Sequence, residues 1–449
     1  MTSPGPFGIF SLILCTVVPL TAQQPRARDL GVPFEGTPGP LNAITDVAGV
    51  EVGHATLVRG SGPVVIGEGP VRTGVTAVWP RGREVPDPVY AAWFTLNGDG
   101  EMTGTTWVRD SGIMEGPVMI TNTLSVGVVH HAVIRWGVAR GIERGAGPWL
   151  AALPVVGETW DGTLNDIRGQ HVTEADALAA MEAARGGPVA EGNVGGGTGM
   201  ICHRFKGGIG TSSRVVQVAD ERYTVGVLVQ CNYGGREPFR VAGVPVGREI
   251  ADLMPERPGR EQLEGVEGEA DRDGSIIVVV ATDAPVLTHQ LERMARRVSL
   301  GLARNGSVSS NGSGDIFVAF STANREAASE RAAAADARVL ANGRLNPLFA
   351  ATVEATEEAI INALVAAETM TGANDVTVHA LPHDRLREVL RRYNRLQGCP
   401  TSDPSSSPDG RPSATRPGPP TSARRRAPGW ATPRPASTRR ARCRPAPRT

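Results

Sequence analysis

Near-continuous runs of apolar residues predict the main strands of this 449-residue chain. The clearest runs are Ser275 to Thr282 (SIIVVVAT), Asp315 to Thr322 (DIFVAFST) and Thr224 to Asn232 (TVGVLVQCN), with a shorter one at Val376 to Leu381. Such runs, which lack polar alternation, are typical of strands that are buried on both faces. We therefore predict a sheet that is covered on both sides.

Helical patterns alternate with these strands. Thr173 and Asp176 form a capping-box pattern that predicts a helix ending near Ala184. Thr288 to Ala303 carries its apolar residues on one stripe, and Asn346 to Thr369 is long and rich in alanine. Helices combined with doubly buried strands predict a layered α/β sandwich.

The N-terminal end has the pattern of an export signal. Phe7 to Leu20 is apolar but too short to span a bilayer, and Leu20-Thr21-Ala22 is a small-residue cleavage sequence. We predict that residues 1–22 are a signal peptide, although they lack Lys and Arg, and that the protein is periplasmic or secreted. No other segment is long and apolar enough for a membrane span, so we expect no membrane partner.

The C-terminal end, residues 397–449, is dominated by Pro, Arg, Ser and Thr and has no apolar periodicity, which predicts a disordered tail. A polyanion-binding segment and a product of read-through or a frameshift are both compatible with this composition. Residues 401–449 contain 11 Arg and 2 Asp, so the rest of this neutral chain carries a net charge of −9. A mildly acidic body disfavours a nucleic-acid partner.

The motifs that would indicate a metal or a nucleotide cofactor are missing from the sequence. The sequence contains no HExxH motif, and the Gly-rich stretch Asn193 to Met200 lacks the Lys-Ser/Thr ending of a P-loop. We expect these glycines to serve close backbone packing. The five cysteines show no metal or disulfide pattern, and Cys202 and Cys231 are expected to be core thiols. We therefore predict no metal and no cofactor.

One local pattern carries candidate chemistry. Asp273-Gly274-Ser275 runs directly into an apolar strand, where a Gly-Ser bond is compatible with a simple turn. It is also compatible with self-cleavage, in which the Ser275 hydroxyl attacks the Gly274 carbonyl and leaves a new N-terminal serine. That serine can then act as a nucleophile whose own α-amine, with an ordinary pKa near 8, is the base.

The body of the chain resembles the DmpA-type L-aminopeptidase/D-esterase family, which includes the β-peptidyl aminopeptidases. The resemblance rests on nine blocks in family order between about Arg26 and Leu396. They are ITDVAGVEVGHAT (44–56), NGDGEMTGTTWVRDSG (97–112), GPVMITNTLSVG (116–127), ETWDGTLNDI (158–167), EGNVGGGTGM (191–200), FKGGIGTSSR (205–214), VQCNYG (229–234), DGSIIVVVATDAP (273–285) and SGDIFVAFST (313–322).

This resemblance implies a four-layer αββα sandwich of the N-terminal-nucleophile type, self-cleaved into an α chain (23–274) and a β chain (275–396). It implies hydrolysis of N-terminal residues, including β- or D-residues, from small peptides, amino-acid amides or esters through an acyl-enzyme. It also implies a homo-oligomer of α/β pairs.

The resemblance further implies roles for single residues. Ser275 matches the nucleophile and Gly274 the residue ahead of the cut. Ser313 matches a serine that hydrogen-bonds the nucleophile's amine or hydroxyl, and Asp315 an acid that orients this network. Asn232 matches an amide that stabilises the oxyanion.

The substrate-binding positions include one departure from the family. Glu158 matches an acid that holds the substrate's free ammonium. Trp160, however, stands where a relative has Tyr, so a hydroxyl donor to the oxyanion is missing. An apolar pocket wall is the alternative role for Trp160.

Two other functions remain open on the sequence. Ornithine acetyltransferases resemble this fold and also cleave themselves, which leaves an acyltransferase as one alternative. The other is a non-catalytic binding protein that is never cut.

Overall fold

The computed structural model describes residues 25–84, 87–141, 153–256, 274–328 and 333–396. The chain divides into two units, 1–399 and 400–449, and all described residues belong to the first. The predicted signal peptide (1–22) and the predicted tail (397–449) lie outside the described residues.

Two mixed β-sheets form the centre of this unit. The larger has the order β4-β3-β12-β11-β10-β9. Its strands are β4 (Ile113–Met114), β3 (Val89–Gly98), β12 (Gly314–Ser321), β11 (Ile276–Thr282), β10 (Glu221–Cys231) and β9 (Gly208–Val218). The smaller sheet has the order β1-β2-β5-β6. Its strands are β1 (Glu51–Arg59), β2 (Val71–Trp79), β5 (Val118–Asn122) and β6 (Val155–Thr159).

Two-stranded pairs and helices complete the unit. The pairs are β7 (Ile201–Cys202) with β8 (Phe205–Lys206), and β13 (Met370–Thr371) with β14 (Thr377–Val378). The longer helices are α2 (Val126–Ala139), α3 (Glu174–Glu182), α5 (Thr288–Arg304), α7 (Asn346–Ala366) and α8 (His383–Arg392). The shorter ones are α1 (Thr105–Ser111), α4 (Val246–Glu249) and α6 (Arg325–Ala328).

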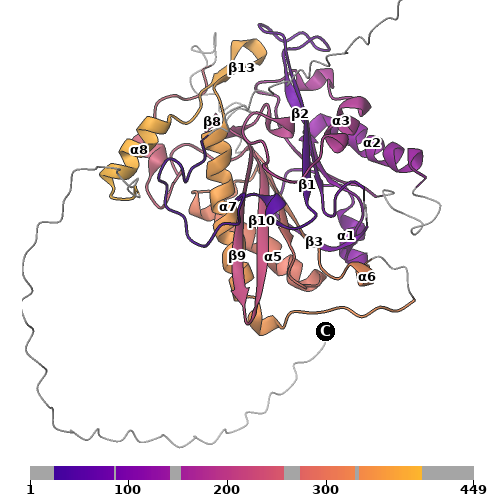
Figure 1. The fold of residues 1–449 in the computed structure, drawn as a ribbon. Helices are drawn as coiled ribbons and strands as arrows, with labels where there is room; N and C mark the ends of the chain where they lie inside the picture. Colours follow the sequence, from indigo (N-terminus) through magenta and orange to yellow (C-terminus); the bar gives the residue numbers. More distant parts are fainter. Residues whose placement is uncertain (1–24, 85–86, 142–152, 257–273, 329–332, 397–449) are drawn as a thin grey trace, which may run out of the picture. The chain divides into compact units, whose positions relative to one another are not determined.

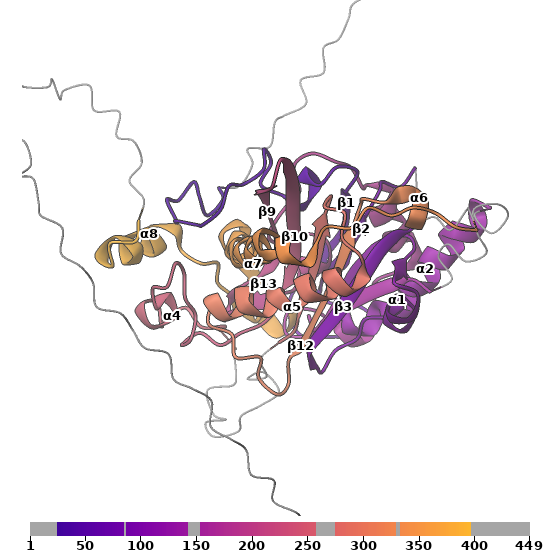
Figure 2. The same ribbon diagram turned by 90° about the horizontal axis from the view of Figure 1, so that it is seen from below.

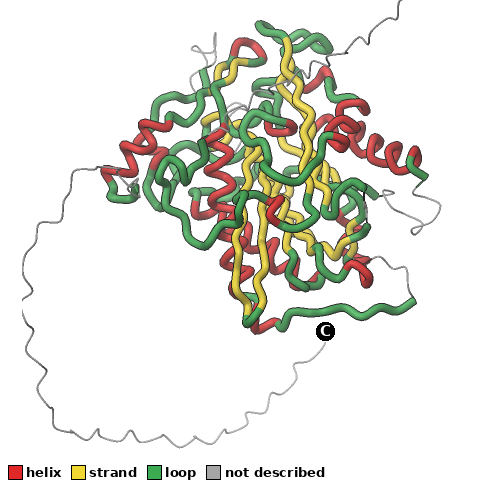
Figure 3. Tube along the Cα trace, in the orientation of Figure 1, coloured by secondary structure: helices red, strands yellow, loops and turns green. Residues whose placement is uncertain are grey.

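The helices cover the outer face of each sheet. α5 and α7 pack on the six-stranded sheet, whereas α2 and α3 pack on the four-stranded one. Figures 1 and 2 show α7 on one side of the strands and α2 on the other, and Figure 3 shows the strands (yellow) between helices (red). The described residues therefore form the layered sandwich that the sequence patterns predicted, in the four-layer αββα order that the family resemblance implied.

Side-chain alternation along β11 explains why its sequence is apolar from Ile276 to Ala281. Val278 and Val280 belong to the core beneath α5 and α7, and Ile277 and Val279 belong to the core between the sheets. Because successive side chains of a strand point to opposite faces, a strand between two cores needs apolar residues at every position.

Most of the predicted elements are confirmed. The three long apolar runs form β10, β11 and β12, and the three helical patterns form α3, α5 and α7. The run at 376–381 is shorter than expected, since only Thr377–Val378 pairs as a strand, with β13. The Gly-rich stretch packs closely against backbone as expected, because a Cβ on Gly197 would overlap the backbone nitrogen of Ile209.

The prediction that Cys202 and Cys231 are free core thiols is wrong. The two form a disulfide that joins β7 to the end of β10. Their spacing of 29 residues matches no local motif, and only the antiparallel return of the chain brings them together. The bond ties Asn232, the next residue, to the β7–β8 segment.

Candidate active site

Sheet topology gathers the candidate residues at one edge of the six-stranded sheet. β11 begins directly after Ser275, and β12 runs parallel to it, so both start at this edge. β10 is antiparallel to β11, so Asn232, which follows β10, lies at the same edge. Residues from three segments far apart in the sequence therefore meet around the Gly274–Ser275 bond.

Backbone and hydroxyl donors surround that bond. The Gly314 N–H donates to Ser275 Oγ at 3.0 Å, and the Ser313 hydroxyl lies 3.0 Å from the Gly274 carbonyl oxygen. Ser275 is buried. A Cβ on Gly274 would overlap the Asn232 carbonyl oxygen and lie 2.8 Å from Asn232 Nδ2, so only glycine fits ahead of Ser275.

Asp315 is a fully buried carboxyl that receives two serine hydroxyls. Ser313 Oγ lies 2.6 Å from Asp315 Oδ1, and the Ser309 hydroxyl contacts Oδ2. The Ser313 hydroxyl has one hydrogen, which it can donate either to Asp315 Oδ1 or to the Gly274 carbonyl oxygen. Ser313 thus lies between the buried carboxyl and the carbonyl that Ser275 would attack.

The Asn232 side chain is held at both ends. Its Oδ1 accepts from the Ile201 N–H at 2.7 Å, and its Nδ2 donates to the Trp160 carbonyl at 2.9 Å. An amide nitrogen carries two hydrogens, and Nδ2 also faces Gly274. A rigid donor therefore lies beside the residue whose place a substrate's acyl group would take.

The smaller sheet supplies an acid. Glu158 lies near the end of β6, next to parallel β5, and its carboxyl accepts from the Thr123 hydroxyl and from the Glu101 N–H, the latter at 2.9 Å. Burial raises the pKa of Glu158, with the charges of Glu101 and Asp99 adding to the effect against its two hydrogen bonds.

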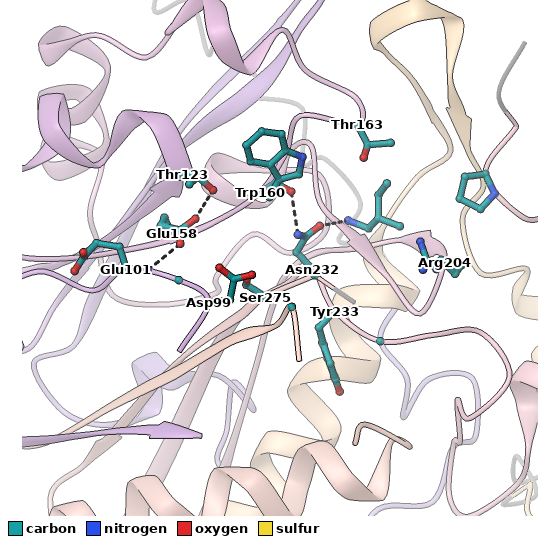
Figure 4. Close-up of a pocket in the computed structure, with 16 residues that line it drawn as sticks. Asp99, Glu101, Thr123, Glu158, Trp160, Thr163, Arg204, Asn232, Tyr233 and Ser275 are labelled. Carbon is teal, nitrogen blue, oxygen red and sulfur yellow. Dashed lines mark hydrogen bonds between the residues drawn. The ribbon is translucent and has the colours of Figure 1, made fainter. Parts of the chain in front are cut away.

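One pocket of about 390 Å³ is lined by Glu158, Asn232 and the Gly274–Ser275 bond. Its lining residues are Asp99, Gly100, Glu101, Thr123, Glu158, Trp160, Thr163, Ile201, Arg204, Asn232, Tyr233, Gly234, Pro255, Gly274, Ser275 and Gly312. Figure 4 shows Glu101 and Glu158 at one end, Asp99, Ser275 and Asn232 in the middle of the view, and Arg204 at the other end. The acidic end suits a cation next to the serine.

Trp160 forms part of the pocket wall, and its side chain is about half exposed. Its ring packs over Gly162, where a Cβ would lie 2.6 Å from a ring carbon. Its backbone carbonyl, rather than the ring, contacts Asn232.

The structure brings together all seven residues that the sequence singled out: Glu158, Trp160, Asn232, Gly274, Ser275, Ser313 and Asp315. Ser313 contacts the Gly274 carbonyl, whereas the donor to Ser275 Oγ is the Gly314 N–H. Sequence reasoning missed Asp99, Glu101 and that backbone donor. Both acids lie in the NGDGEMTG block (97–104). Two acids among glycines at the end of a strand could have indicated that they lie in the site.

No group of three or more His, Cys, Asp or Glu side chains in the described ranges is arranged to hold a metal ion. None of the helices found there is long and apolar enough to cross a membrane.

Comparison with known proteins places this geometry in context. Residues 42–378 match the model of peptidase family S58. The chain is 56% identical over 378 residues to the β-peptidyl aminopeptidase BapA of Sphingosinicella microcystinivorans, covering 84% of this chain and 94% of that protein. It is 49% identical over 389 residues to BapA of Sphingosinicella xenopeptidilytica, covering 86% of this chain and 96% of that protein.

A solved structure is similar over the same region. It is the L-aminopeptidase D-Ala-esterase/amidase of Ochrobactrum anthropi, described as a variant of the Ntn hydrolase fold. The TM-score is 0.76 at 48% identity, covering 83% of this chain and 100% of that one. With the family model matching well over half of its length, the chain belongs to peptidase family S58.

Proposed function

We propose that this protein is a self-processing serine aminopeptidase that removes the N-terminal residue of small peptides, amides or esters. The observation that carries the proposal is a Gly-Ser bond inside a pocket with acids at one end. An ammonium held there sets the first residue of a substrate against Ser275, so that cleavage occurs one residue from the N-terminus.

Maturation comes first in this proposal. The Ser275 hydroxyl attacks the Gly274 carbonyl carbon, its proton passes to the Ser275 nitrogen, and the C–N bond breaks. Water then hydrolyses the ester and frees Ser275 as a new N-terminus. The Ser313 hydroxyl, 3.0 Å from the Gly274 oxygen, is placed to stabilise the charge that develops there.

Turnover uses the groups that maturation frees. The Ser275 α-amine takes the hydroxyl proton, and Oγ attacks the substrate's first carbonyl. Asn232 Nδ2 donates to the oxyanion, and the departing amine receives the proton. Water then releases the acyl group from Ser275.

The preferred substrates in this proposal carry an N-terminal β-amino residue. Support comes from the two relatives named β-peptidyl aminopeptidases, at 56% and 49% identity. Comparing a β-homoamino-acid p-nitroanilide with its L-α counterpart tests this point. A lower kcat/KM for the β-substrate than for the α-substrate would refute it.

The test of the whole proposal is a denaturing gel with N-terminal sequencing of each band. With residues 23–274 and 275–449 sharing the 47.1 kDa by length, we expect chains of about 26 and 18 kDa, the smaller beginning Ser-Ile-Ile-Val. Ser275→Ala should give one uncut and inactive chain. A Ser275→Ala protein that is cut at Gly274 and hydrolyses an amino-acid p-nitroanilide would overturn the proposal.

The same assay separates the alternatives. A wild-type chain that stays whole and inactive after purification indicates a binding protein. Acyl transfer to an added amine in preference to water indicates an acyltransferase.

A further inference from the structure

Lys206, the only lysine of the sequence, is fully buried beside the candidate site. Its Nζ donates to three backbone carbonyls, those of Gly207 (2.8 Å), Met200 (2.9 Å) and Gly197 (3.3 Å). An ammonium has three N–H donors and a neutral amine only two, so this cage of carbonyls matches the charged form. Buried charges are costly and need such compensation.

One of these carbonyls belongs to the peptide unit that holds Asn232. The Met200 oxygen accepts from Lys206 Nζ and also from the Gly207 N–H at 2.9 Å. The N–H of the same peptide, that of Ile201, donates to Asn232 Oδ1 at 2.7 Å. The ammonium and the Asn232 amide are therefore the two ends of one hydrogen-bonded chain.

The hydrogen bonds of such a chain polarise one another. The Lys206 ammonium, bound to the Met200 oxygen, makes the Ile201 N–H a stronger donor. The stronger hydrogen bond to Asn232 Oδ1 then makes Asn232 Nδ2 a stronger donor. Nδ2 faces Gly274, the position of the acyl group in the proposed reaction. The effect is thus directed at the oxyanion.

We propose that Lys206 is a positioning residue that orients and polarises the Asn232 amide, through the Met200–Ile201 peptide, toward the oxyanion of the reaction. This inference rests on the proposed function. Burial lowers the pKa of Lys206 to about 7, and all three of its carbonyl acceptors act against that loss of charge.

The test is a double-mutant cycle on mature protein, with Lys206→Met, Asn232→Ala and the pair combined. Asn232→Ala should lower kcat about 10²-fold, the typical effect of one lost oxyanion donor. Lys206→Met should lower kcat roughly 10-fold with KM changed less than about 2-fold, because its target is the transition state. The double variant should be no slower than Asn232→Ala alone, within about 2-fold.

Arg236 is the matched control, because it is also buried and donates to carbonyls, among them those of His203 and Ile250. Its acceptors are the carbonyls of His203, Arg204, Ile250, Asp252 and Leu253, none of which belongs to the Met200–Ile201 peptide. Any loss of kcat in Arg236→Met should therefore multiply with that of Asn232→Ala. Multiplicative losses for Lys206→Met would overturn the proposal, since they indicate a general structural effect.

If Lys206→Met does not mature, Lys206→Gln takes its place in the cycle. Should neither variant mature while Asn232→Ala does, Lys206 acts on more than Asn232 and the proposal is wrong. The proposed function fails separately, through an active and cleaved Ser275→Ala. If Asn232→Ala keeps its full kcat, the oxyanion role of Asn232 and this inference are both wrong.

Discussion

The Glu158 carboxyl is almost inaccessible to water, yet it lies in a pocket that also contains Asp99 and Glu101. If it holds the substrate ammonium, Glu158→Gln should lower kcat/KM about 10- to 100-fold, the usual value of a charge-assisted hydrogen bond. Glu101→Gln is the control, because the Glu101 side chain is exposed. Glu101→Gln should lower kcat/KM less than about 3-fold. If steady-state assays show equal losses of kcat/KM in the two variants, the assignment of Glu158 to the ammonium is contradicted.

The pH dependence of the same residue gives a second prediction. The raised pKa of Glu158 means that its carboxyl remains protonated above pH 4.5, and ammonium binding needs it ionised. kcat/KM should therefore rise with pH through this raised pKa, in addition to the rise from the Ser275 α-amine. Below both pKa values the logarithmic slope should approach two in the wild type and one in Glu158→Gln. If Glu158→Gln has the same slope as the wild type, Glu158 does not contribute to the pH dependence of kcat/KM.

Ser313 and Ser309 both contact Asp315, but only Ser313 reaches the Gly274 carbonyl. Ser313→Ala should therefore slow self-cleavage at least about 10-fold, because a donor to the developing oxyanion is lost. Ser309→Ala should change the rate less than about 3-fold. A gel time course of freshly expressed protein measures both, and comparable rates would show that the carbonyl contact is unimportant.

Single elements were predictable where burial dictates the sequence. β11 from Ile276 to Ala281 and β12 from Ile316 to Phe320 are apolar at each position because one core lies on either face. The α5 stripe faces the six-stranded sheet. Strand pairing was not predictable from patterns alone. β13 and β14 are two residues long, and residues 379–381, which follow β14, do not extend the pairing.

The disulfide links β7 to β10, and it could not be predicted from the spacing of its cysteines. By closing a loop of about 29 residues, it should stabilise the fold by about 3 to 4 kcal/mol. The double variant Cys202→Ala/Cys231→Ala should lose that amount in denaturant unfolding. Reductant should have no further effect on it, and two reactive thiols at these positions in native protein would refute the bond.

At the scale of the whole described unit, the site exists because two sheets stack. Ser275, Asn232 and Ser313 come from one sheet, and Glu158 comes from the other. Local sequence patterns identified only Ser275 as a candidate. Its partners were identified through the family resemblance, because Glu158 and Ser275, for example, are 117 positions apart and share no local pattern.

The disulfide also bears on where the protein resides. We propose that it is exported, because disulfides persist in oxidising compartments and residues 1–22 have the pattern of a signal peptide. Cell fractionation with N-terminal sequencing should find the mature chain in the periplasm or the medium. A cytosolic protein that retains residues 1–22 would contradict this proposal.

The C-terminal boundary of the folded unit gives the last prediction. The family match ends at residue 378, and α8 (His383–Arg392) buries Leu386, Val389 and Leu390. Residues 401–449 offer no apolar stripe in their sequence, so their deletion removes nothing that could pack. We expect Tm within about 2 °C of the full chain and unchanged kcat/KM.

Deletion of residues 383–449 is the matched control, because it also removes α8 and exposes the surface that three buried side chains cover. At about 25 cal/mol per Å² of apolar surface, each such side chain contributes about 1.5–3 kcal/mol. Thermal unfolding should therefore separate the two deletions by several degrees or more. If the shorter deletion is as destabilising as the longer one, the tail belongs to the folded protein and the unit does not end at α8.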